Sequence, residues 1–146
     1  MKKWQFYLLS FTWGLPLTLI GCIVALALMV AGYKPARFGW CWCFEIGYDW
    51  GGLELGVFFL ANKNSSYTLK CHEHGHAFQN TLFGVFMPFI VCIPSAVRYW
   101  YRECLHRVKG VRLSEMPDYD SIWFEGQATR IGKAFIERSK HNESVD

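Results

Sequence analysis

Two long apolar stretches dominate the hydrophobic pattern of this chain. The first runs from Gln5 to Tyr33 without a charged residue and supplies more than the roughly 20 apolar residues that a helix needs to cross a bilayer. A secretory signal is the alternative explanation of the basic start, but signal cores are only about 7–15 residues long and end at a small-residue cleavage site. We therefore predict a transmembrane helix over 5–33. Pro16 would kink this helix or mark its first turn.

The second apolar stretch, 81–100, is barely long enough to span a membrane. Pro88 and Pro94 interrupt it, and Arg98 lies near its far end. This pattern is consistent with a short span, a broken helix or a re-entrant segment that enters the membrane and returns on the same side.

Between the two apolar stretches, aromatic and β-branched residues flank a turn signal. Asp49-Trp50-Gly51-Gly52 interrupts the pattern, and such a junction between two β-favouring runs is typical of a hairpin. We predict a β-hairpin over 38–61, in which Phe38–Gly47 pairs with Leu53–Ala61.

Two further helices complete the predicted elements. Ser65 or Ser66 can cap a helix over 67–83. In the segment 121–138 the apolar residues recur at helical spacing with charge on the opposite face. The predicted fold class is thus an α+β membrane protein with a single domain over 1–146.

Composition supports a membrane protein and limits the kinds of partner that we expect. Of the 146 residues, 52% are hydrophobic and only 18% are charged, which is more apolar than an average soluble domain. The net charge of +3 is too small to indicate nucleic-acid binding, so we expect a lipid bilayer and no nucleic acid as partner. Cys22 and Cys92 lie inside the apolar stretches, a placement that favours reduced thiols over a disulfide framework.

The chemistry lies in His72-Glu73-His74-Gly75-His76. Residues four apart lie on one face of a helix, so His72 and His76 can bind the same zinc ion. Zinc activates a water molecule, and Glu73 stands beside the pair as its general base. This His-Glu-x-x-His pattern is typical of zinc enzymes that hydrolyse peptide bonds. We interpret His74 as a spare residue and Cys71 as a packing residue.

A catalytic zinc ion usually has three protein ligands. A metzincin site would place a third histidine at position 82, which is Leu82 here. We favour Glu125 as the third ligand, because a carboxylate among apolar neighbours needs a partner. An acidic residue is also favourable at a helix start without any metal. The remaining candidates are His106, Glu115, Asp118 and Asp120.

This ligand set has a topological consequence. His72 and His76 precede the second apolar stretch, and Glu125 follows it. If 81–100 crossed the bilayer fully, the two halves of the site would lie on opposite faces. The two prolines favour a re-entrant path, which is tolerated where protein covers the irregular backbone.

The sequence resembles a group of small uncharacterised bacterial membrane proteins. The resemblance rests on HEHGHAFQNTLFGVFMPFIVCIPS, on ELGVFFL before it and on WFEGQAT after it. The group's pattern is HE-x-GH-x-x-Q, followed by GP and IPS and by a later Glu-x-x-Ala element, although Val85 follows Gly84 here. More distantly, the site is similar to gluzincin metallopeptidases. That similarity implies His72, His76 and Glu125 as zinc ligands and Glu73 as general base.

From these observations we predict a membrane-bound zinc metallopeptidase of unknown substrate. One alternative is a non-catalytic metal-binding or metal-sensing protein in which Cys71, His72, His74 and His76 act together. The other is a membrane scaffold without metal. The resemblance implies a bacterial cell membrane. The basic run from Arg98 to Arg112 and the reduced thiols favour the cytoplasmic side of that membrane for the site. The oligomeric state stays open.

Overall fold

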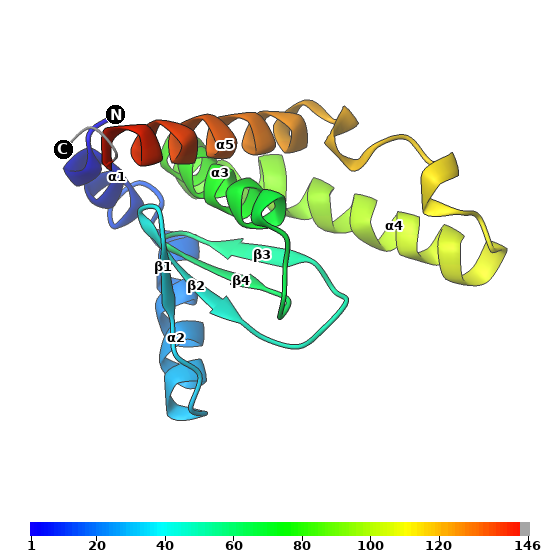
Figure 1. Cartoon of the computed structure of the whole chain (residues 1–146), viewed down its shortest axis with the longest axis horizontal. Coiled ribbons are helices and arrows are strands. Elements are labelled where there is room, and N and C mark those ends of the chain that lie inside the picture. The colour runs from blue at the N-terminus through cyan, green and yellow to red at the C-terminus, as the bar shows by residue number, and fades with distance from the viewer. Residues whose placement is uncertain (144–146) are drawn as a thin grey trace.

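The computed structural model describes residues 1–143, without the side chains of residues 140, 142 and 143. It is an α+β fold with a small four-stranded sheet. In chain order the main elements are α1 (Lys3–Ser10), α2 (Leu15–Val30), β1 (Ala36–Phe38), β2 (Cys41–Glu45), β3 (Gly52–Leu55), β4 (Phe58–Ala61), α3 (Tyr67–Phe83), α4 (Ile93–Lys109) and α5 (Trp123–Glu143). Figure 1 shows α3 lying between the sheet and α5.

The single N-terminal helix predicted over 5–33 is wrong. The segment forms α1 and α2, which are bent by 89° relative to each other. The chain turns at Phe11–Gly14, and Pro16 lies in the first turn of α2. Proline is well tolerated there because its missing N–H has no helical partner, whereas it would break a continuous helix. Pro16 therefore marks a helix start, which was one of its two predicted roles.

The second apolar stretch is broken, as its prolines predict. After α3 the chain forms a 3-10 turn at Gly84–Phe86 and a π-helical turn at Pro88–Cys92 before α4 begins. Gly84 has a φ of 54°, and a Cβ there would lie 2.2 Å from the Trp13 ring. Only glycine fits this position, so α3 ends there.

Within the described residues, no single helix is both long and apolar enough to cross a membrane. Two bent pairs pass that test when their helices are taken together. One is α1 with α2. The other joins Tyr67–Phe86 to Pro88–Lys109 at 114°.

The sheet also differs from the predicted hairpin. β2 and β4, which lie within the two predicted strands, pair in parallel, and the strand order is β1-β2-β4-β3. Gly39 and Gly56 have positive φ and each opens a two-residue turn, so β1 pairs with β2 and β3 with β4. A hairpin turn thus lies inside each predicted strand, because glycine with positive φ is what such turns require. Leu53–Ala61 covers nearly the whole β3-β4 hairpin, whereas Phe38–Gly47 covers β2 and only the last residue of β1.

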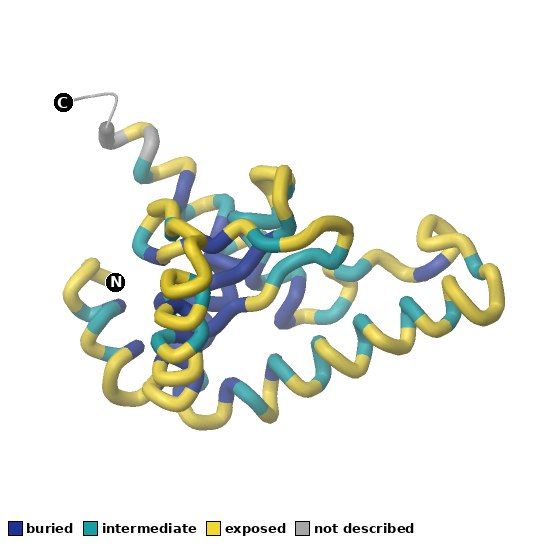
Figure 2. Tube along the Cα trace, turned by 90° about the horizontal axis from the view of Figure 1, so that it is seen from below, coloured by how far each residue is buried: buried dark blue, intermediate teal, exposed yellow. Residues whose placement is uncertain are grey.

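The remaining two helix predictions are confirmed. α3 has the predicted bounds, and the Ser66 side chain caps it by accepting a hydrogen bond from the Leu69 N–H at 3.1 Å. The C-terminal helix is present as α5 but extends beyond residue 138. Figure 2 shows that buried residues concentrate around the sheet, whereas α4 is mainly exposed or half-buried.

Candidate metal centre

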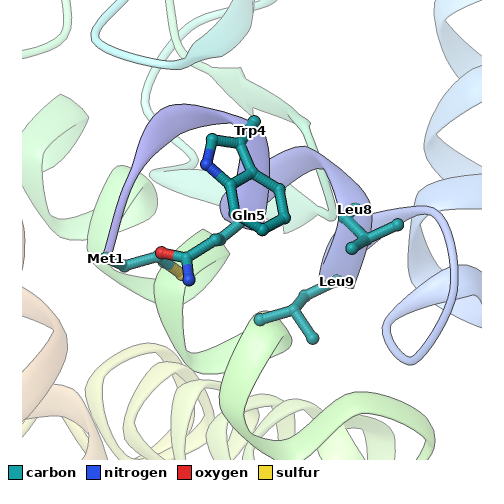
Figure 3. A pocket seen from close by; sticks show the side chains of 5 residues that line it. All are labelled: Met1, Trp4, Gln5, Leu8 and Leu9. Carbon is teal, nitrogen blue, oxygen red and sulfur yellow. The ribbon is translucent and has the colours of Figure 1, made fainter.

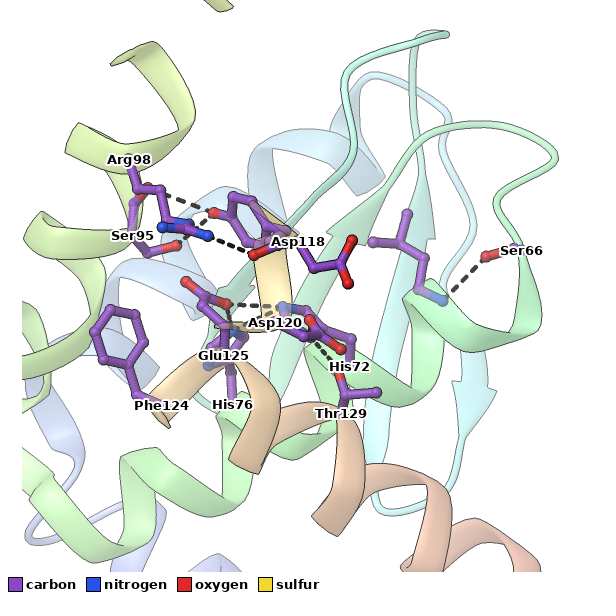
Figure 4. Close-up of polar contacts among 12 residues, drawn as sticks. Ser66, His72, His76, Ser95, Arg98, Asp118, Asp120, Phe124, Glu125 and Thr129 are labelled. Carbon is purple, nitrogen blue, oxygen red and sulfur yellow. Dashed lines mark hydrogen bonds and ion pairs between the residues drawn. The ribbon is translucent and has the colours of Figure 1, made fainter. Parts of the chain in front are cut away.

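Three side chains from two helices converge at the centre of the molecule. His72 and His76 lie one turn apart on α3, and their Nε2 atoms are 3.0 Å apart. Glu125, in the first turn of α5, places Oε2 3.1 Å from each of these nitrogens. Figure 4 shows the three side chains pointing toward one another. The structure thus brings together the three residues that the sequence selected as ligands.

The other nitrogen of each imidazole has a fixed partner. His76 Nδ1 lies 2.7 Å from Gln79 Oε1. An amide oxygen only accepts hydrogen bonds, so Nδ1 carries a proton and Nε2 is the nitrogen that faces Glu125 and could bind a metal ion. His72 Nδ1 lies 2.8 Å from the Thr129 hydroxyl. Such partners orient metal-binding imidazoles and set their tautomers.

Gln79 is itself held by α5. Its Nε2 donates to the Phe124 carbonyl at 2.7 Å and to Gln127 Oε1 at 2.9 Å. Gln79 therefore links the His76 ring to the residues on both sides of Glu125. Sequence reasoning assigned no role to Gln79, Gln127 or Thr129, although all three lie within the segments that carry the resemblance.

The cluster exists because α3 and α5 touch through their backbones. A Cβ on Gly75 would lie 1.9 Å from the Ala128 carbonyl oxygen, and one on Gly132 would lie 1.8 Å from the Cys71 carbonyl oxygen. Glycine at both positions therefore permits the close approach. That approach places Glu125 within reach of the two imidazoles.

The electrostatics of the cluster favour a cation. Glu125 is fully buried. Burial alone would raise its pKa, but hydrogen bonds with His72 and His76 lower the pKa to about 2. Burial likewise opposes the charged form of His76, yet the Glu125 carboxylate and Glu73 raise the pKa of His76 to about 9. A buried anion that stabilises positive charge on its neighbour is also suited to a metal ion.

Glu73 lies beside this group but outside it, between α3 and the edge strand β3. A Cβ on Gly52 would lie 2.4 Å from Glu73 Oε1, so the absence of a side chain at Gly52 leaves room for the carboxylate. Burial raises the pKa of Glu73, whereas His76 and His72 lower it. The predicted base is therefore buried, close to both imidazoles, and available as a proton acceptor.

His74 faces the other side of α3. It is fully buried, its Nε2 accepts the Trp40 backbone N–H at 3.1 Å, and its ring stacks on Phe135 with centroids 4.8 Å apart. Burial, together with Arg37, lowers its pKa to about 4. His74 is thus a neutral packing residue and not part of the cluster. A metal site that uses His72, His74 and His76 together does not fit this arrangement.

The remaining ligand candidates lie outside the cluster. Asp120 Oδ1 is 4.0 Å from His72 Nδ1, which is the nitrogen turned away from Glu125, and its side chain is half exposed. His106 lies near the far end of α4, where its Nδ1 is 2.9 Å from the Val111 carbonyl oxygen. Neither geometry places a ligand atom next to the Nε2 atoms.

Sequence reasoning missed one further buried carboxylate, Glu54. It lies two residues after Gly52 on β3 and is only 5% exposed, and its side chain accepts a hydrogen bond from the Gly56 N–H. Burial raises its pKa to about 8, although His76 opposes this shift. Residues two apart on a strand share a face, so alternation along Gly52–Leu55 would have placed Glu54 beside Gly52.

The donor set fits a metal ion. In tetrahedral coordination with bonds of about 2.0–2.1 Å, ligand atoms are about 3.3 Å apart, close to the 3.0–3.1 Å between the three donor atoms here. His72, His76 and Glu125 could therefore hold a metal ion. By contrast, the shallow pocket of about 430 Å³ on α1, shown in Figure 3, is lined mostly by apolar side chains and includes none of these ligands.

Comparisons with known proteins add no identity to this geometry. No family model, curated protein or solved structure matches the chain. The residues of the site are therefore the basis for inferring a function.

Proposed function

We propose that the chain is a membrane-bound, zinc-dependent peptidase. The observation that carries this proposal is the convergence of His72, His76 and Glu125 from two helices, with Glu73 buried beside them. Two imidazoles and one carboxylate are a typical ligand set of catalytic zinc, which leaves one coordination position for water or substrate. A purely structural zinc site would be closed by a fourth protein ligand.

Bound zinc would supply Lewis-acid chemistry by polarising a carbonyl oxygen and acidifying a water molecule. Glu73 would take a proton from the attacking water and give it to the amine that leaves when the C–N bond breaks. Its burial between α3 and β3 keeps the carboxylate away from bulk water, and the raised pKa makes it a better proton acceptor. Gln79 and Thr129 would hold the imidazoles in their metal-binding tautomers.

The edge strand offers a surface for a peptide backbone. β3 pairs with β4 on one side only. The Asn62 N–H donates to the Gly51 carbonyl. In an antiparallel pair every second residue bonds to the neighbouring strand, so Gly51, Leu53 and Leu55 are the residues whose backbone groups face β4. The backbone groups of Gly52 and Glu54 thus point away from β4. An extended substrate could pair with them as an additional strand next to Glu73.

A second candidate function keeps the same three ligands without catalysis. A metal-sensing protein would need His72, His76 and Glu125 but would have no use for a buried carboxylate at Glu73. We propose the cytoplasmic side of a membrane for either function, because both bent helix pairs carry exposed apolar residues and Arg98–Arg112 is basic.

The test is the Glu73→Gln variant of the full chain in detergent, loaded with zinc. We expect cleavage of a library of fluorescence-quenched peptides to fall by at least about 100-fold, while the zinc content stays at one ion per chain. Glu137→Gln is the matched control, because Glu137 lies exposed on α5. Equal cleavage by the wild type and Glu73→Gln would refute the mechanism. Zinc binding without any cleavage by the wild type would favour the sensor.

A further inference from the structure

α4 has an exposed apolar face for which the rest of the structure provides no cover. None of its residues is buried. Ile93, Val97, Trp100, Tyr101 and Val108 are 53–77% exposed, and Cys104 is exposed as well. Their spacing of three, four, seven and eight residues places all six on one side of the helix. These six residues form the apolar stripe of α4.

The opposite side of α4 already has a partner. Arg98 donates to the Asp118 carbonyl and to Ser121 Oγ at 2.8 Å, and Arg102 donates to the Pro117 carbonyl. Both guanidinium groups also lie over the Tyr119 ring. The polar face of α4 thus binds the segment that leads to Glu125, so the orientation of the helix is fixed and the apolar stripe faces outward.

The apolar surface continues beyond α4. Phe86 and Phe89 are 55% and 68% exposed, and the Phe86 ring packs edge-on against Trp13 in the turn before α2. α2 in turn exposes Leu19, Ile23 and Leu26. Figure 1 shows α4 extending away from the sheet. Exposed apolar surface that runs over several elements marks an interaction site and is rare on a soluble monomer.

The charges of α4 decide between crossing a membrane and lying on it. From Arg98 to Lys109 the helix carries Arg98, Arg102, Glu103, Arg107 and Lys109, which is too many for the hydrocarbon core. Arg107 pairs with Glu103 at 2.6 Å, and Arg112, just beyond the helix, lies 4.0 Å from Glu115. Lys109 and Arg112 are both exposed at the far end. A helix with one apolar face and basic residues along its edge is suited to the interface of an anionic bilayer.

We propose that α4 lies in the plane of an anionic membrane, with its apolar stripe among the acyl chains and its terminal basic residues at the lipid headgroups. The other occupants of such a face, a second copy of this chain or a soluble protein, would not require the basic residues at its end. The inference is independent of the proposed peptidase, because it rests on no metal and no activity. It places the segment 117–121, and with it the metal centre, close to the membrane surface.

The test uses Cys104 as a reporter on the apolar stripe. Cys22 and Cys92 are replaced by alanine because they are half-buried and could react, whereas Cys41, Cys43 and Cys71 are buried and stay. The chain is labelled at Cys104 with an environment-sensitive fluorophore and reconstituted in phosphatidylcholine vesicles with or without phosphatidylglycerol. The matched control carries Cys104→Ala and His106→Cys, which moves the label to the opposite, exposed side of α4 and keeps every basic residue that the proposal uses.

We expect lipids with a nitroxide on the acyl chain to quench the label at position 104 at least threefold more strongly than the label at 106. We expect this quenching to fall at least twofold without phosphatidylglycerol. Equal weak quenching at both positions, in protein that stays with the vesicles, would overturn the proposal. Oxidative crosslinking between Cys104 of two copies without lipid quenching would overturn it too, because the apolar stripe would then be a dimer contact. Circular dichroism of each variant checks that α4 is retained.

Discussion

Gly75 of α3 and Ala128 of α5 are in backbone contact, at a distance that leaves no room for a methyl group. Gly75 lies between the two histidine ligands, and Ala128 lies three residues after Glu125. This close approach of the two helices therefore lies at the metal centre. A change at this contact is expected to disturb both stability and metal binding.

Gly75→Ala should destabilise the fold by about 3 kcal/mol and separate Glu125 from the imidazoles, because the added methyl group would meet backbone atoms that cannot move aside. We expect a lower thermal midpoint and zinc binding weakened at least tenfold in the chains that remain folded. Arg130→Ala, at an exposed position of α5, should change neither value. Wild-type zinc affinity in Gly75→Ala would show that the site does not depend on this contact.

Thr129→Val keeps the shape of the side chain and removes the hydroxyl that contacts His72 Nδ1. Loss of a partner that orients a metal-binding imidazole typically lowers metal affinity 10- to 100-fold. We expect that loss in a zinc competition titration, and recovery in Thr129→Ser. If the valine variant binds zinc as tightly as the serine variant, the hydroxyl does not orient His72.

His74→Ala distinguishes packing from metal binding. The variant removes a fully buried ring that stacks on Phe135 and accepts the Trp40 N–H, so we expect a loss of about 2–3 kcal/mol of stability. Zinc per folded chain, measured by elemental analysis after size-exclusion chromatography, should stay at one. His72→Ala should lose the zinc instead. Zinc that disappears with His74 would restore the site in which His72, His74 and His76 act together.

Local signals explain which parts of this architecture the sequence could predict. Ser66, the histidine spacing and the absence of proline from Tyr67 to Phe83 all lie within one segment, so the bounds of α3 are predictable. Glu125 was identifiable because a carboxylate among apolar residues requires a partner. The segments that carry the resemblance also contain Gln79 and Thr129, whose roles become visible only when α3 and α5 are placed side by side.

Features that the hydrophobic pattern does not show explain why the predicted hairpin and the predicted N-terminal helix were wrong. Gly39 and Gly56 each begin a turn inside a run that was otherwise typical of one strand, and the parallel pairing of β2 with β4 follows from those turns. The bend between α1 and α2 was hidden because Phe11–Gly14 is as apolar as the helices around it. Whether the chain crosses a membrane stays a prediction, as does the re-entrant path of the segment after α3.

Glu54 predicts a pH dependence of stability with a definite sign. Its folded-state pKa of about 8 lies above the ordinary value of 4.5, so the unfolded chain gives up the proton first. The contribution of Glu54 is fully present below about pH 4.5 and is lost as the pH rises toward 8. The slope from this one group is up to about 1.4 kcal/mol per pH unit.

Glu54→Gln removes this titration and keeps an oxygen that can accept the Gly56 N–H. We expect the variant to equal the wild type near pH 4 and to be the more stable of the two at pH 8. Unfolding is followed in detergent with a chelator present, so that metal binding does not contribute to the pH dependence. Glu115→Gln, whose side chain is 60% exposed, should follow the wild-type curve. Parallel curves for Glu54→Gln and the wild type would mean that Glu54 is ionised in the folded chain, with a cation close to it.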